Sequence, residues 1–331
     1  MVRKKLRGCD TSGSAKLKRM TSPAASGVRM SWEQIPEAVR GAIEHELGAS
    51  VVEAASQPGG FSPGVAARVR LADGTRRFVK AACANPNPDT PQIHRREIRV
   101  AQALPPDVPA PRLRFAYDDG DWVALVFDDV EGRPPRLPWA RAELERVLAA
   151  LSDMAAALTP SPLVADIAGV RLAPIFNGWS SFAGSSAPPP ADVAGHLDEL
   201  VALEAAFPEA IAGDALVHLD VRADNLLLTD DRVFVVDWPW ASVGAPWIDL
   251  VALLPSVAMQ GGPPPETVWR AHPFARRADA AQVDAFLAAL AGMFTWQGAL
   301  PPSPGLPTLR AFQTEQGVHA RAWLAARRGW S

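Results

Sequence analysis

The amino-acid sequence predicts an α+β fold of two lobes: a small, antiparallel β-rich N-terminal lobe with one inserted helix, and a larger, mainly α-helical C-terminal lobe. Three observations indicate this division. Apolar residues alternate in several short segments before residue 128, whereas after residue 139 they recur with the period of an amphipathic helix. A turn-rich segment at 132–135 separates the two patterns. With 331 residues, the chain is also longer than one average domain.

The first lobe is expected to start with a helix over 31–48, where apolar residues return every three or four positions. A second helix is expected from Thr90, as N-cap, and Pro91, at the first helical position, to about Leu104. Asp-Gly turns join pairs of short alternating segments, which indicates hairpins. The expected strands are Ser50–Ala54, Val65–Leu71, Arg77–Ala81, Leu113–Tyr117 and Trp122–Phe127.

The second lobe is expected to open with a strongly amphipathic helix that begins near residue 139 and continues to Leu158. The segment 159–190 is rich in Pro and Ser and is expected to be a loop. A helix over about Asp192–Phe207 and a strand-rich block at 215–237 follow. Helices separated by proline clusters are expected from residue 247 onwards.

The distribution of charge separates a basic tail from the rest of the chain. The first 29 residues hold eight Lys or Arg and one acid, which leaves 25 basic and 35 acidic residues in 31–331, a net charge of −10. An acidic body argues against nucleic acid as a partner. We therefore divide the chain into a disordered basic tail at 1–30, an N-terminal lobe at 31–131 and a C-terminal lobe at 132–331; Met30 as the true start is the alternative.

Composition also bears on the cellular setting. The two cysteines, Cys9 and Cys83, are too few for a disulfide framework or a thiolate metal site, which favours a reduced, cytoplasmic environment. No apolar run approaches the roughly 20 residues that a membrane span requires, so we expect no membrane partner. The sequence leaves the oligomeric state open between a monomer and a homodimer.

The segment 216–237 carries the strongest chemical signal. Two apolar runs flank residues 229–232, whose composition is typical of a turn. If this segment is a hairpin, Asn225 and Asp237 lie opposite each other at its open end, because residue 231, which is midway between them in the sequence, falls in the turn. An amide oxygen beside a carboxylate suits Mg²⁺, and Asp220 can accept a hydroxyl proton. A hairpin with solvated turn acids is the alternative, but it does not explain Asp237, which ends an apolar run.

These residues resemble a known catalytic signature. His218-x-Asp220-x4-Asn225, followed by Val-Asp-Trp at 236–238, is similar to the motif of aminoglycoside phosphotransferases and choline kinases, which are relatives of the protein kinases. The spacing of the kinase catalytic loop, HRDxxxxN, is matched with Leu219 in place of Arg. The resemblance implies a protein kinase-like fold, with ATP or GTP and Mg²⁺ as cofactors. It also implies that the N-terminal lobe, 31–131, binds the nucleotide and that the C-terminal lobe, 132–331, is the catalytic and substrate-binding lobe.

The resemblance also implies roles for single residues. Asp220 is expected to be the catalytic base or the residue that orients the acceptor hydroxyl, and Asn225 and Asp237 are expected to be metal ligands. Arg222 lies two positions after the base and is expected either to reach the transferred phosphoryl group or to be a surface arginine. His218 is expected to brace the loop. Asp249 resembles a later family aspartate, and we expect it to be structural.

The first lobe offers independent support. Phe78-Val79-Lys80-Ala81 resembles the kinase strand whose lysine pairs with ATP phosphates. Glu97 lies four residues after Ile93 on the apolar face of the expected helix, where an acid needs a partner. Lys80 is the natural partner of Glu97. A surface lysine and a solvated glutamate form the alternative, which fits the helix phase less well.

Two further segments are expected to contact the nucleotide. The glycine-rich turn 59–64, with Gly60 and Ser62, falls where a kinase-like fold covers the phosphates with backbone N–H groups, although it departs from GxGxxG and a plain hairpin turn is the alternative. It lacks GK[ST], which excludes a P-loop. Asp128 and Val130 are expected in the interlobe hinge, where their backbone would meet the base.

The expected partner is a small hydroxyl-bearing acceptor. After Asp249 the sequence has four acids and seven arginines, whereas a polycationic aminoglycoside favours a strongly acidic pocket. We therefore expect a less cationic acceptor, and keep an antibiotic, a choline-like compound and a sugar as alternatives. A non-catalytic nucleotide-binding pseudokinase or regulator on the same fold is the rival function. The complete set of catalytic residue types argues against that rival.

Overall fold

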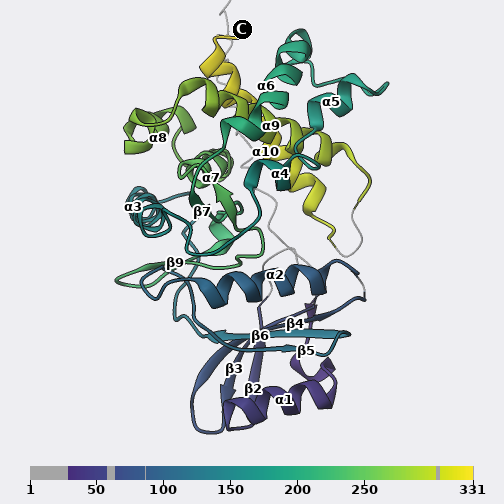
Figure 1. Ribbon diagram of the computed structural model, residues 1–331, viewed down its shortest axis with the longest axis vertical. Coiled ribbons are helices and arrows are strands. Elements are labelled where there is room, and N and C mark those ends of the chain that lie inside the picture. Colours follow the sequence, from purple (N-terminus) through teal and green to yellow (C-terminus); the bar gives the residue numbers. More distant parts are fainter. Residues whose placement is uncertain (1–28, 58–63, 86, 303–305, 331) are drawn as a thin grey trace, which may run out of the picture.

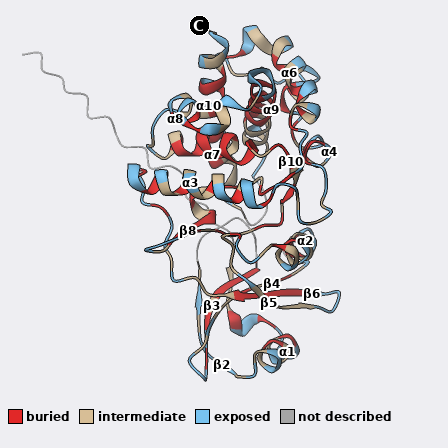
Figure 2. Cartoon of the chain, turned by 60° about the vertical axis from the view of Figure 1, so that its left-hand side comes forward, coloured by how far each residue is buried: buried red, intermediate tan, exposed pale blue. Residues whose placement is uncertain are grey.

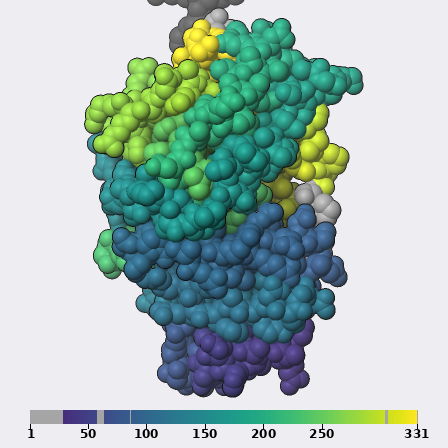
Figure 3. Space-filling view, in the orientation of Figure 1, coloured from purple at the N-terminus to yellow at the C-terminus, as the bar shows by residue number. Residues whose placement is uncertain are grey.

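The computed structural model of the protein describes residues 29–57, 64–85, 87–302 and 306–330. It confirms the two-lobed α+β architecture: a β-rich N-terminal lobe lies at one end, and a larger helical lobe stacks on it (Figure 1). In the space-filling view the two lobes meet along a broad junction across the middle of the molecule (Figure 3).

The N-terminal lobe is built on a six-stranded sheet in which β3 pairs with β4 along one edge and with β1 and β2 along the other. All pairs are antiparallel except β1 with β3. Arg29 and Met30, which we expected in the tail, form β1 and pair with Gly64 and Val65. The strands are β1 (Arg29–Met30), β2 (Val51–Ser56), β3 (Gly64–Leu71), β4 (Arg76–Cys83), β5 (Leu113–Asp118) and β6 (Trp122–Asp128).

One helix covers each face of this sheet (Figure 1). Because side chains alternate across a strand, one face of β3 sends Val65, Ala67 and Val69 toward α1 (Glu37–Leu47), which packs there with Trp32 and Ile35. The other face packs against α2 (Thr90–Ala103), which lies between the sheet and the helical lobe.

Both helices differ slightly from expectation at their starts. The expected helix over 31–48 is divided by Pro36 into a 3-10 turn, Trp32–Gln34, and α1, since proline has no N–H to continue a helical ladder. The N-cap of α2 is Asp89, one residue before the expected Thr90, and Thr90 is the first helical residue.

The C-terminal lobe is a set of helices around one large core, seen as the dense buried region of Figure 2. Helix α9 is central and packs against α5, α6 and α10. The helices are α3 (Arg141–Ala157), α4 (Ala168–Leu172), α5 (Gly178–Ala183), α6 (Leu197–Ala210), α7 (Ile248–Met259), α8 (Pro265–Ala271), α9 (Ala280–Ala299) and α10 (Leu309–Arg328). In the described part of the chain, none of the helices has both the length and the apolar character needed to cross a membrane.

Two of these helices lie where we expected only a loop. Helices α4 and α5 fall within 159–190, and each has six residues or fewer, too few for a periodic pattern to be visible. A glycine determines how α5 meets α9: a Cβ on Gly178 would lie 2.0 Å from the carbonyl oxygen of Gly292. The two backbones can approach this closely only because residue 178 has no side chain.

Two small sheets lie in the C-terminal lobe: β7 (Ala215–Val217) pairs with β10 (Ser242–Gly244), and β8 (Leu226–Leu228) pairs with β9 (Val233–Val235). The second pair is the expected hairpin with its turn at 229–232. Its register is shifted by one residue from our prediction, because Leu226 pairs with Val235 and the Val236 N–H donates to the Asn225 carbonyl. Asp237 therefore lies one residue beyond the position opposite Asn225.

Candidate active site

A cavity of about 540 Å³ lies between the lobes and receives side chains from both. Strands β3, β4 and β6 contribute apolar walls that include Ala66, Phe78 and Phe127. The C-terminal lobe contributes Leu227 from β8 and the residues that follow β9. Apolar walls with a few charged groups at one end are typical of a small-molecule or cofactor site.

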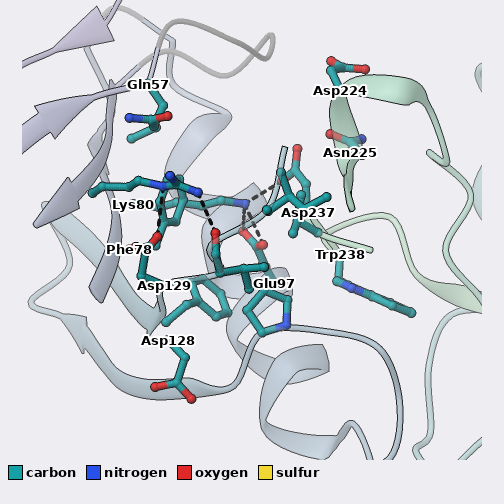
Figure 4. A pocket seen from close by; sticks show the side chains of 18 of the residues that line it. Gln57, Phe78, Lys80, Glu97, Asp128, Asp129, Asp224, Asn225, Asp237 and Trp238 are labelled. Carbon is teal, nitrogen blue, oxygen red and sulfur yellow. Dashed lines mark hydrogen bonds and ion pairs between the residues drawn. The ribbon is translucent and has the colours of Figure 1, made fainter. Parts of the chain in front are cut away.

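Lys80 and Glu97 lie in this cavity and are in contact (Figure 4). Lys80 projects from β4, and its Nζ lies 2.7 and 2.8 Å from the two carboxylate oxygens of Glu97, which projects from α2. The same Nζ lies 2.8 Å from Asp237 Oδ1. An ammonium has three N–H donors, so these three contacts engage all of them. The structure thus brings together three residues that are distant in sequence.

This contact sets the ionisation of Lys80 and Asp237. Burial alone would lower the pKa of Lys80, but the charges of Asp237 and Glu97 outweigh it and raise the pKa above its usual value. Burial would raise the pKa of Asp237, but the charge and hydrogen bond of Lys80 lower it to about 2. Both groups are therefore charged at neutral pH.

The loop between β7 and β8 carries His218, which is fully buried and holds the loop in shape. Its Nδ1 accepts a hydrogen bond from the Asp220 N–H at 3.1 Å, so Nε2 carries the proton and donates to the Val236 carbonyl at 3.0 Å. Burial lowers the pKa of His218 to about 4, so the ring is neutral. The bonds tie the Asp220 loop to the strand end before Asp237, which agrees with the expected bracing role.

Asp249, the second residue of α7, holds the same loop from the other side. Its two carboxylate oxygens accept the backbone N–H groups of His218 at 2.8 Å and Leu219 at 2.7 Å. Leu219 has φ +66°, a left-handed conformation that is unfavourable for a residue with a side chain. Asp249 therefore stabilises a strained loop conformation directly before Asp220.

Asp220 does not line the cavity itself but is bonded to residues that belong to this site. Its Oδ1 lies 2.7 Å from Arg222 Nη1, and its backbone carbonyl and Oδ2 accept hydrogen bonds from Asn225 Nδ2 at 2.8 and 3.2 Å. Burial raises the pKa of Asp220 to about 7, against the lowering effect of Arg222. A carboxylate with a pKa near neutrality is well matched to accepting a proton.

Arg222 is not a surface arginine, since its side chain is 16% exposed and also pairs with Asp224 at 3.0 Å. Its guanidinium carbon lies 5.6 Å from the ring centre of Phe312 in α10. Arg222 thus links the Asp220 loop to the C-terminal helices.

The residues present fit a magnesium ion that binds together with phosphate. Asn225 Nδ2 is committed to Asp220, which leaves its Oδ1 for a ligand, and Asp237 has one oxygen beyond the one that contacts Lys80. Both residues line the cavity. Within the described residues, no group of three or more His, Cys, Asp or Glu side chains forms a metal site. Two oxygen ligands suffice for Mg²⁺ when phosphate oxygens and water complete its shell.

The segments expected to meet the nucleotide have different outcomes. Gly60 and Ser62 lie outside the described residues. Asp128 and Val130 line the cavity, but the Asp128 N–H donates to the Arg112 carbonyl. The Val130 carbonyl accepts from Arg68 Nη2 at 2.6 Å and from the Gly132 N–H. Among the described residues the Val130 N–H has no partner, so it remains available to a ligand.

The cavity contains polar residues that our sequence analysis did not select. Arg68 on β3 pairs with Asp129, whose side chain is 3% exposed, at 3.0 Å. His94 and Arg29 also line the cavity. A sequence signal existed for His94, because it precedes Glu97 by one helical turn and shares its face. Arg29 and Arg68 gave no such signal, because only the fold brings them to this cavity.

Comparisons with known proteins agree with the fold. The sequence profile of the phosphotransferase enzyme family (APH) matches residues 59–302. No curated protein sequence matches the chain.

Solved structures of kinases resemble the chain at low identity. Choline kinase LicA from Streptococcus pneumoniae has a TM-score of 0.59 at 12% identity, over 86% of this chain and 98% of that one. A choline/ethanolamine kinase family protein from Mesorhizobium loti has 0.57 at 18%, over 88% and 99%. A thermostable mutant of aminoglycoside phosphotransferase APH(4)-Ia, in a ternary complex with AMP-PNP and hygromycin B, has 0.57 at 14%, over 89% and 99%. At these identities the likeness establishes a kinase-like fold, and the profile match spans most of the sequence. The chain therefore belongs to the phosphotransferase enzyme family.

Proposed function

We propose that this protein is a small-molecule kinase that transfers the γ-phosphoryl group of ATP to a hydroxyl group of its acceptor in the presence of Mg²⁺. The observation that carries the proposal is the contact of Lys80 with Glu97 and Asp237 in a cavity between the lobes. Asp220, with its pKa raised to about 7 by burial, lies on the loop tied to that cavity. Neighbouring folds solved with ADP or AMP-PNP support nucleotide binding.

The residues divide the reaction between them. Asp220 accepts the proton of the acceptor hydroxyl. At the same time the hydroxyl oxygen forms a bond to the γ-phosphorus, and the bond from that phosphorus to the β,γ-bridging oxygen breaks. When the nucleotide binds, Lys80 contacts phosphate oxygens in place of Asp237 and keeps its contact with Glu97. Asn225 and Asp237 hold the metal, which when bound neutralises charge on the phosphate oxygens. Arg222 orients Asp220 and balances its charge.

The base of the nucleotide would occupy the apolar part of the cavity. Phe78, Phe127 and Leu227 line this region, and an aromatic base buries well against such side chains. The Val130 N–H supplies a donor at its edge.

We infer that the acceptor is less cationic than an aminoglycoside. The acidic side chains of the C-terminal helices are already engaged: Glu266 pairs with Arg270 and Arg327, and Asp284 pairs with Arg327 and Arg328. Asp279 caps α9, and Glu315 lies 3.6 Å from His319. Carboxylates that are already paired offer little attraction to a polycation.

A panel of hydroxyl compounds tests the proposal. Purified protein is incubated with ATP or GTP, Mg²⁺ and each candidate, including choline-like compounds, sugars, macrolides and aminoglycosides, and acceptor-dependent nucleoside diphosphate release is measured. We expect turnover with at least one acceptor and a loss of about 10²- to 10⁴-fold in Asp220→Asn, with ADP affinity retained. Nucleotide binding with turnover unchanged in Asp220→Asn would contradict a catalytic role for this site.

A further inference from the structure

His94 is an unexplained polar side chain in the cavity wall. It lies on α2, one helical turn before Glu97, and is 4% exposed. Its Nδ1 is buried without a hydrogen-bond partner among the described residues, although it lines the cavity. A buried polar atom without a hydrogen-bond partner destabilises the fold, and nearly all buried polar atoms in proteins have a partner. The position of His94 therefore points to a partner that a ligand supplies.

The ionisation of His94 limits what that ligand can be. Burial, together with the charge of Lys80, lowers the pKa of His94 to about 3. The ring is neutral at physiological pH and offers one N–H donor and one acceptor nitrogen. Phosphate oxygens accept hydrogen bonds and are the groups that Lys80 is expected to contact. A neutral donor beside Lys80 can bind such an oxygen without adding another charge to a region that already contains a lysine.

Arg29 lies in the wall of the same cavity. Strand β1 pairs with Gly64 and Val65 at the beginning of β3, and this pairing brings Arg29 to the cavity. Burial lowers the pKa of Arg29, and the negative charge of Asp237 opposes this shift. The charge of Arg29 also acts on His94. A cation and a neutral donor thus line the same cavity as Lys80 and Asp237.

We propose that His94, together with Arg29, contacts the phosphate chain of the bound nucleotide, with the His94 ring N–H donating to a phosphate oxygen. The inference rests on the proposed function and assigns two residues outside the catalytic motif to the nucleotide site. It also gives a role to Arg29, a residue that a chain beginning at Met30 would lack.

The test compares a nucleotide with and without phosphates. Isothermal titration calorimetry measures the affinity of the full chain for ADP with Mg²⁺ and for adenosine. In His94→Leu we expect ADP to bind about 3- to 10-fold more weakly, the effect of one hydrogen bond, and adenosine to bind as in the wild type. The midpoint of thermal unfolding should stay the same or rise, because leucine removes the unsatisfied nitrogen. His94→Asn, which keeps an N–H donor, should recover part of the affinity.

Arginine variants give the matched comparison. Arg29→Gln should weaken ADP binding and leave adenosine binding unchanged. Arg40→Gln alters a cation on α1, on the face of the sheet away from the cavity, and should change neither. Wild-type ADP affinity in both His94→Leu and Arg29→Gln would overturn the inference, as would equal losses for ADP and adenosine, or failure of both His94 variants to fold. Wild-type protein that binds no nucleotide would instead refute the proposed function.

Discussion

Replacing Lys80 by methionine tests the central contact of the site through stability as well as activity. Glu97 is 2% exposed, and Lys80 is the cation that its two oxygens contact. Removing one partner of a buried ion pair leaves an uncompensated charge and costs about 3–5 kcal/mol. We expect Lys80→Met to lower the free energy of unfolding by about this amount and to abolish phosphoryl transfer.

A second variant separates the stability lost with the ion pair from the stability lost through altered packing. In the double variant Lys80→Met/Glu97→Leu neither charge of the buried pair remains, and apolar replacement of a whole buried pair is often close to neutral. Asp237 also loses Lys80, but its side chain is 29% exposed and keeps access to water. Most of the lost stability should therefore return, whereas activity should not. Arg95→Met provides the control, because its partner Asp118 is 39% exposed and such surface pairs contribute at most about 1 kcal/mol.

The assay is urea denaturation followed by tryptophan fluorescence at pH 8 and pH 5. Burial raises the pKa of Glu97, and without Lys80 the folded-state pKa lies still further above the unfolded value of about 4.3. A carboxyl group with a raised pKa loses stability as pH increases through that pKa, so Lys80→Met should be less destabilised at pH 5 than at pH 8. The reasoning is refuted if Lys80→Met is as stable as wild type, or if the double variant loses the sum of the single losses.

Three other predictions concern the loop and the metal. Asp249→Asn keeps one acceptor for two buried N–H groups and should cost about 1.5–3 kcal/mol in urea denaturation and lower kcat; unchanged kcat would contradict the bracing role. Because burial raises the pKa of Asp220 to about 7 and a base must be ionised to accept a proton, kcat/KM should rise with pH through about 7; a flat profile between pH 5.5 and 8.5 would contradict the proposed role of Asp220 as base. Since the proposed metal site has only two protein ligands, Asn225 and Asp237, calorimetry should show Mg²⁺ binding with ADP present and little without it; tight binding to the nucleotide-free protein would contradict this metal site.

Local patterns in the sequence predicted the contact of Lys80 and Glu97 because each residue stood out within its own element. An acid on the apolar face of a helix requires a buried partner, and a lysine within an apolar strand requires the same. The helix phase placed Glu97 on the inner face of α2, and the structure brings it within 2.7 Å of Lys80.

The hairpin prediction was correct in type and wrong by one residue in register. The turn composition at 229–232 identified where the chain reverses, but composition does not determine which residues close a turn. Here the Thr229 N–H bonds the Arg232 carbonyl, and the pairing continues to Asn225 with Val236. Asp237 then has φ +70°, a left-handed conformation that no pattern in this segment of the sequence predicted.

By itself the sequence determined the lobe order, most helices and strands, and the residues of the catalytic motif, because periodicity, turn chemistry and motif spacing act over a few neighbouring residues. Only the tertiary structure decided that Arg29 joins the sheet, that α4 and α5 form in a proline-rich segment, and that Arg68 lines the cavity. These features depend on contacts between residues far apart in the chain. A two-residue strand or a single inward arginine has no period of its own, and its place is fixed only when the partner element packs against it.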